Sequence, residues 1–159
     1  MKALSLTQPW ASLVEFRAKR IETRSWATRY TGPLAIHAAK GFPGWAKEFS
    51  KEPPVSVFFG PDYEYPRGQV LCIVKLMGCR RTEDVRAQLT AQELAFGDYS
   101  DGRFAWFLEF VEVIKDRPAA TGHLGIWEWE QCTCPAKAWS ADGSDANEST
   151  CSVHSEIKT

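Results

Sequence analysis

The chain has 159 residues, a formal net charge of −1, a hydrophobic fraction of 44% and seven tryptophans. This length favours one domain with a sizeable core, and seven tryptophans are more than such a core hides, so some are expected to line a cleft. Because the net charge is near zero, any nucleic-acid binding would need a local basic patch and not the overall charge. The sequence has no apolar run long enough to predict a membrane-spanning helix.

The first elements expected are a strand over residues 2–6 and a helix over residues 8–18. Thr7 can cap this helix, and Pro9 is tolerated in a first turn. Trp10, Leu13 and Val14 recur at helical spacing, which predicts one apolar face. Trp10 either belongs to this core face or lies at the rim of a cleft.

A charged stretch follows, Lys19-Arg20-Ile21-Glu22-Thr23-Arg24-Ser25-Trp26. In an extended segment, Glu22, Arg24 and Trp26 share one face and Thr23 points to the other, while Lys19 stands at the entry. An amine, a carboxylate, a guanidinium and an indole on one face can bind a phosphate, a base edge or a planar ring. The alternative is an exposed ion pair of little energetic weight.

The middle of the chain alternates predicted elements with one long loop. A strand over residues 34–38 places His37 opposite its larger apolar neighbours, where it is either structural or in contact with a ligand. A short helix is expected over residues 43–51, followed by a loop over residues 52–68 that holds four prolines. Residues 69–77 form a strand, in which Cys72 reads as a buried small hydrophobe.

The last elements surround a polar turn. Thr82 is a plausible helix cap, and Thr90-x-x-Glu93 is a capping box for a second short helix that ends at Gly97. Residues 98–103, which include Tyr99 and Arg103, form either a solvated turn or a loop at the site. Strands over 104–114 and 124–129 complete a set of five or six, with two to four short helices. This set predicts an α+β fold built on a small β-barrel.

Residues 131–159 differ from residues 1–130, which we expect to form the domain. The last segment is polar and is expected to be a weakly ordered tail. Cys132-x-Cys134 and Cys151-x-x-His154 resemble fragments of a zinc site, but the first pair is spaced too closely, so no metal is predicted. Five cysteines at irregular spacing, together with an apolar start too short for a signal peptide, favour a cytoplasmic protein.

Several of these motifs together resemble the ASCH domain family of the PUA-like superfamily. Lys19-x-x-Glu22-x-Arg24 is similar to the core of its G-x-K-x-x-E-x-R motif, and the segments 4–11, 32–38 and 122–127 resemble its flanking strands in the same order. The resemblance covers about residues 1–130 and implies a PUA-like barrel with a cleft between barrel and helices. One departure is Arg17, which stands where the motif has its glycine.

The resemblance favours binding of RNA or a modified nucleoside, without a cofactor and without a membrane. Lys19, Arg24 and Arg103 would contact phosphates, Trp10, Trp26 or Tyr99 would stack a base, and Glu22 would accept from an exocyclic amine. The segments that resemble the family add the following candidate ligand contacts: Ser5, Gln8, Pro9 and His37.

The alternative hypothesis is hydrolysis. A similar ASCH subfamily removes the acyl group from N4-acetylcytidine with a lysine, a threonine and a glutamate, and its threonine falls at the position of Glu22 here. Without that nucleophile, Glu22 would act as general base, with Lys19 and Arg24 stabilising negative charge on an amide or on an RNA phosphodiester. A third hypothesis, peptide binding by the aromatic residues, has no support from the charged strand.

Overall fold

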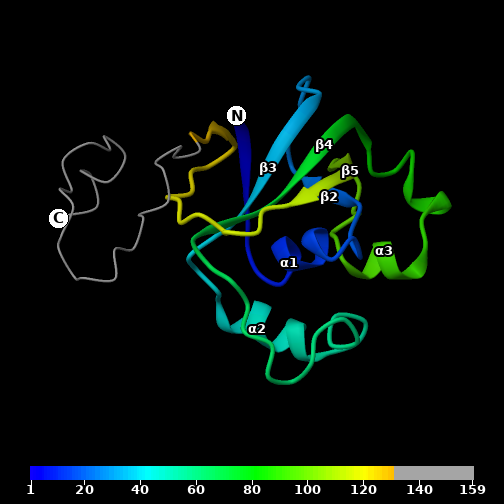
Figure 1. Cartoon of the computed structure of the whole chain (residues 1–159). Coiled ribbons are helices and arrows are strands. Elements are labelled where there is room, and N and C mark those ends of the chain that lie inside the picture. Colours follow the sequence, from blue (N-terminus) through cyan, green and yellow to red (C-terminus); the bar gives the residue numbers. More distant parts are fainter. Residues whose placement is uncertain (131–159) are drawn as a thin grey trace, which may run out of the picture. The chain divides into compact units, whose positions relative to one another are not determined.

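The computed structural model describes residues 1–130 (Figure 1), and within them six strands form one sheet. In chain order the elements are β1 (Lys2–Leu6), α1 (Trp10–Glu15), β2 (Ile21–Arg24), β3 (Gly32–Ala38), α2 (Gly44–Lys51), β4 (Gln69–Arg81), a 3₁₀ turn (Arg86–Gln88), α3 (Ala91–Ala95), β5 (Phe104–Val113) and β6 (Ile126–Glu128).

The sheet has the strand order β2-β5-β4-β3-β1-β6, with β1 and β3 parallel and the other pairs antiparallel. It curls into a half-barrel, and α1 packs on its inner side through Ala11 and Val14. The main core also contains the fully buried Trp106 of β5. The α+β small-barrel fold predicted from the sequence is therefore confirmed.

Local sequence rules explain most element boundaries. The strand predicted over residues 2–6 is β1, and Thr90 caps α3 by accepting a hydrogen bond from the Glu93 amide, as the capping box predicts. The helix expected over 8–18 is shorter: α1 begins after Pro9, and Thr7 provides no cap. No α-helix begins at Thr82 either; its hydroxyl donates to the Ser100 carbonyl, 2.7 Å away.

The turn between α1 and β2 keeps the backbone that a glycine would adopt. Arg17 has φ +62°, in the left-handed region, although L side chains are disfavoured there. The amides of Ala18 and Lys19 both donate to the Leu13 carbonyl, at 2.9 and 3.0 Å, and close the helix end. The guanidinium of Arg17 lies 4.2 Å from the centre of the Phe110 ring. Arginine at the motif's glycine position thus adopts the left-handed conformation that a glycine favours.

Candidate functional site

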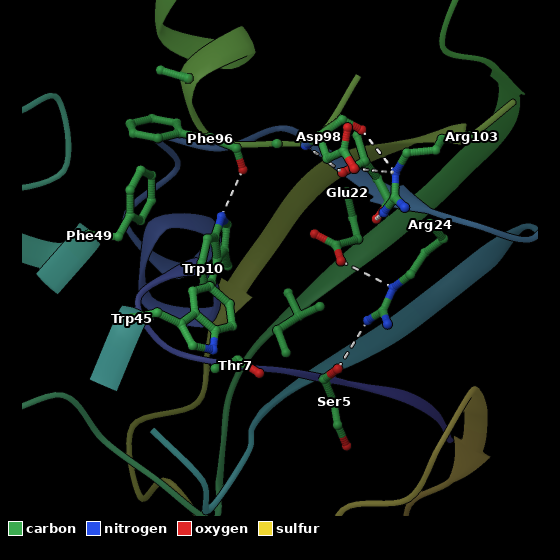
Figure 2. A pocket seen from close by; sticks show the side chains of 14 residues that line it. Ser5, Thr7, Trp10, Glu22, Arg24, Trp45, Phe49, Phe96, Asp98 and Arg103 are labelled. Atoms are coloured by element: carbon green, nitrogen blue, oxygen red, sulfur yellow. Dashed lines mark hydrogen bonds and ion pairs between the residues drawn. The ribbon is translucent and has the colours of Figure 1, made fainter. Parts of the chain in front are cut away.

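A cavity of about 450 Å³ lies beside β2, at the edge of the curled sheet (Figure 2). The residues that line it come from β1, the turn between β1 and α1, α1, β2, α2, the end of α3 and the loop between α3 and β5. They are Ser5, Leu6, Thr7, Trp10, Glu22, Thr23, Arg24, Trp45, Phe49, Ala95, Phe96, Gly97, Asp98 and Arg103. Five residues predicted from the sequence are among them: Ser5, Trp10, Glu22, Arg24 and Arg103.

One wall of the cavity is the charged edge strand. Glu22 Oε1 lies 3.1 Å from Arg24 Nε, and Arg24 Nη2 donates to the Ser5 carbonyl at 3.0 Å. The Arg24 side chain thus reaches from β2 to β1, two strands that are not neighbours in the sheet. Both side chains of the pair are largely covered, at 12% exposed for Glu22 and 25% for Arg24. The alternative of a freely solvated ion pair is therefore excluded.

Lys19 lies beneath this wall and does not line the cavity. It is 2% exposed, and its ammonium donates to the carbonyls of Ile21 and Phe96, the latter at 2.9 Å. The same nitrogen is 3.7 Å from Glu22 Oε2. Burial lowers the pKa of Lys19, while the negative charge of Glu22 opposes that shift. Its position makes Lys19 a residue that holds the Glu22 carboxylate in place.

A second acid–arginine pair extends the polar wall. Asp98 Oδ2 lies 3.3 Å from Arg103 Nε, and Arg103 Nη2 donates to the Thr23 carbonyl, also at 3.3 Å. The Asp98 amide donates to Thr23 Oγ1 at 3.2 Å, which fixes the loop on β2. Hydrogen bonds from Ser100 lower the pKa of Asp98. The polar turn is therefore part of the cavity wall, one of the two alternatives that the sequence left open.

Aromatic rings form the opposite wall. The centroid of the Trp10 ring lies 5.2 Å from that of Phe49, with an interplanar angle of 10°. It lies 5.6 Å from the centroid of the Trp45 ring, with an interplanar angle of 46°. Trp10 Nε1 donates to the Phe96 carbonyl at 2.8 Å, which fixes the indole against the loop after α3. Trp45 is 66% exposed, an unusual amount for such a large apolar side chain. The cavity thus lies between rings and charges, as Figure 2 shows.

Sequence reasoning missed Trp45, Phe49 and Phe96 as members of the site, and it placed Asp98 only in a loop that was a candidate for the site. A signal existed for α2, because Trp45 and Phe49 are four residues apart and therefore share one helix face. That pattern alone does not say which element the face meets, and Trp10 lies 35 positions before Trp45 in the chain.

Three residues that the sequence predicted to contact a ligand do not line the cavity and instead have roles in the fold near it. Gln8 is fully buried, donates to the Pro66 carbonyl at 2.8 Å and accepts from the Ser12 amide at 3.1 Å, so it ties the long loop to α1. Pro9 directly precedes α1. Trp26 lies beyond the end of β2, outside its alternation, and packs edge-on against Trp106 at 4.5 Å.

Two further predicted contacts are buried outside the cavity lining. Tyr99 donates its hydroxyl to Glu93 at 3.3 Å, and burial, followed by the Glu93 charge, raises its pKa. His37 is 1% exposed; its Nε2 donates to the Ala120 carbonyl and its Nδ1 accepts from the Ser5 hydroxyl, both at 3.1 Å. Burial lowers the pKa of His37, so this network holds a neutral imidazole.

Residues 1–130 contain no group of three or more histidine, cysteine or acidic side chains that could hold a metal ion. The cysteine and histidine pairs considered for zinc, from Cys132 to His154, lie outside the described residues. No helix in the described part of the chain is both long enough and apolar enough to cross a membrane.

These features define a small α+β half-barrel domain with a charged edge strand that faces an aromatic wall across a cavity. The chain belongs to the ASCH domain family, whose sequence model matches residues 4–118. It is 35% identical over 131 residues to human Activating signal cointegrator 1 and, to the same extent, to the mouse protein. The match covers 79% of this chain but 22% of each relative, so the chain spans about a fifth of their length.

Proposed function

We propose that this domain binds RNA or a modified nucleoside, with one base inserted into the cavity beside β2. The observation that carries the proposal is the pairing of an exposed indole on one wall with two acid–arginine pairs on the other. A nucleobase needs both kinds of contact, because its faces stack and its edges donate and accept hydrogen bonds. The family resemblance supports an RNA-related ligand.

Trp45 and Trp10 supply the stacking surface in this proposal. Trp45 is exposed before any ligand arrives, so stacking a base on it removes apolar area from water. Trp10 is held by its hydrogen bond to Phe96 and by the parallel Phe49 ring, so it loses little conformational entropy on binding.

The acid–arginine pairs supply the polar contacts. The Glu22 carboxylate can accept from an exocyclic amine or a ring N–H, and Arg24 can donate to a ring nitrogen, a carbonyl or a phosphate. Arg103 offers a second guanidinium on the same side. Lys19 is assigned a positioning role in place of the phosphate contact expected from the sequence, because its ammonium is buried and donates to two backbone carbonyls.

A pair of tryptophan substitutions tests the stacking. Trp45→Ala should weaken the binding of nucleosides or short RNAs by about fivefold or more, because a base–aromatic stack contributes about 1–3 kcal/mol. Trp26→Ala is the matched control, since Trp26 is also exposed, at 37%, and does not line the cavity. Binding is measured by calorimetry after a thermal-shift screen has selected the ligand. Equal losses in the two variants, or none, would contradict the proposal.

Hydrolysis is the second candidate, and it rests on the Glu22 carboxylate at the cavity wall. Glu22 would activate water or a 2′-hydroxyl, and Arg24 would stabilise the developing negative charge. The geometry favours binding instead, because both carboxylate oxygens already lie beside cations, at 3.1 and 3.7 Å, which hold the carboxylate in the cavity wall. Thr23 is an unsuitable nucleophile, since it is 8% exposed and its hydroxyl is occupied by the Asp98 amide.

The two candidates separate in a turnover assay with N4-acetylcytidine and RNA, with and without added divalent metal. A hydrolase should lose at least about a hundredfold in rate in Glu22→Gln while it still binds the ligand. A binding domain should show no turnover in either form. Absence of turnover by the wild-type protein under all these conditions rules out the hydrolytic candidate.

A further inference from the structure

A second cavity, of about 440 Å³, lies beyond Lys19, between the end of α1 and β5. Its floor is apolar, formed by Val14, Val74 and Leu108, which are all buried. Arg17 and Arg20, both exposed, line it together with Phe110 and Glu109. Lys19 also lines this cavity and lies 3.7 Å from Glu22 of the site proposed above. The other lining residues do not belong to that site.

The guanidinium of Arg17 is supported from one side. It lies over the Phe110 ring at 4.2 Å, an attractive cation–π arrangement that restricts the side chain. A planar guanidinium held in this way offers its other face to a second flat group, and nucleobases stack on arginine in this manner.

The backbone beneath the two arginines is fixed. The Arg20 amide donates to Glu93 Oε2 at 3.0 Å, and the Arg20 carbonyl accepts from the Leu108 amide at 2.8 Å. Arg17 adopts φ +62°, a conformation that costs an arginine energy which a glycine would avoid. Strained residues of this kind persist where the surrounding structure holds them, and they concentrate at binding sites.

We propose that this second cavity is a nucleotide-binding site, in which Arg17 backed by Phe110 stacks a base and Arg20 binds the phosphate. The apolar floor accommodates the base edge and sugar, and guanidinium groups pair well with phosphate oxygens. Glu109 lies at the same cavity, and its partner across the β4–β5 pairing is a basic residue, Lys75. The ligand is either a free nucleotide or one nucleotide of a strand.

The test is titration of the ¹⁵N-labelled full chain with adenosine 5′-monophosphate and, separately, with a twelve-nucleotide oligoadenylate. Amide shifts are followed at residues 17–20 and 108–110, and affinities are compared for Arg17→Ala, Arg20→Ala and Arg80→Ala. Arg80 is the matched control because it is exposed on β4 and lines neither cavity. The amide spectrum of each variant also establishes that it is folded.

Saturable shifts at these amides with the monophosphate support a site for a free nucleotide, and shifts with the oligomer alone support a site for a strand. Arg17→Ala and Arg20→Ala should each weaken binding at least about fivefold, and Arg20→Ala should lower the salt slope for the oligomer by about one, while Arg80→Ala should change neither. Unshifted amides with both ligands, or equal losses in Arg80→Ala, overturn the proposal.

Trp45→Ala distinguishes this site from the first cavity. It should leave the shifts at residues 108–110 unchanged even if it abolishes binding beside β2. Loss of these shifts in Trp45→Ala would show that they report on the first cavity and would also overturn the proposal.

Discussion

Removal of the buried Lys19 ammonium should destabilise the fold far more than removal of an exposed lysine. In Lys19→Met, the carbonyls of Ile21 and Phe96 lose their common donor and Glu22 loses one of its two cations. A hydrogen bond to a charged group contributes about 1.5–3 kcal/mol, and breaking a buried charge pair costs about 3–5 kcal/mol. Because these contributions overlap in one ammonium, we expect a loss of about 3–5 kcal/mol in the free energy of unfolding.

Urea denaturation followed by tryptophan fluorescence measures this loss. For a chain of this size, a loss of about 3–5 kcal/mol corresponds to a drop in melting temperature of about 6–20 °C. Lys75→Met is the matched control, because Lys75 is exposed on β4 and should change stability by less than about 0.5 kcal/mol. Glu22→Gln and the double variant Lys19→Met/Glu22→Gln complete a cycle that should give a coupling of about 1–2 kcal/mol.

The reasoning is refuted if Lys19→Met costs less than about 1 kcal/mol, the range expected for an exposed ion pair. A coupling near zero with a large single loss would mean that the two carbonyls, and not Glu22, account for the effect. In that case the role of Lys19 in holding the carboxylate at the cavity wall would be withdrawn.

Three further predictions concern stability. Arg17→Gly should be more stable than Arg17→Ala by about 1 kcal/mol in urea denaturation, because both lose the contact with Phe110 but only glycine relieves the left-handed backbone. The folded state lowers the pKa of Lys19, so the unfolded chain binds more protons between that lowered value and about 10.5. Stability of the wild type relative to Lys19→Met should therefore rise with pH between these two pKa values, and a constant difference over that range would contradict the burial of the ammonium. Thr90→Ala should cost about 1 kcal/mol, since it removes the acceptor for the Glu93 amide at the start of α3, and Thr90→Ser should restore most of the loss.

The fold followed from local patterns to a large extent. Alternation predicted β3 and β4, and the capping box predicted α3, because these signals act over a few residues. Thr82 shows the limit of such rules. Its hydroxyl satisfies the Ser100 carbonyl, 18 residues away, and no local pattern announces a partner at that distance.

The site was predictable where one segment carried it and unpredictable where distant segments meet. Glu22 and Arg24 were found because they are two positions apart on one strand. Trp45 and Phe96 were missed because they come from separate elements that meet only in the folded chain. The sequence singled out Lys19 but predicted that it would contact a phosphate. Residue spacing does not reveal that its ammonium points inward and donates to backbone carbonyls.

The Arg24 guanidinium that joins β2 to the Ser5 carbonyl has a consequence for how the domain adapts. The Arg24 side chain makes this contact, whereas neighbouring strands in the sheet are joined by rows of backbone hydrogen bonds. A change of the Arg24 rotamer would break this contact without breaking any backbone hydrogen bond between strands, and rotamer changes are fast compared with unfolding. The Arg24 contact can therefore rearrange at this edge while the strand pairs of the half-barrel stay intact.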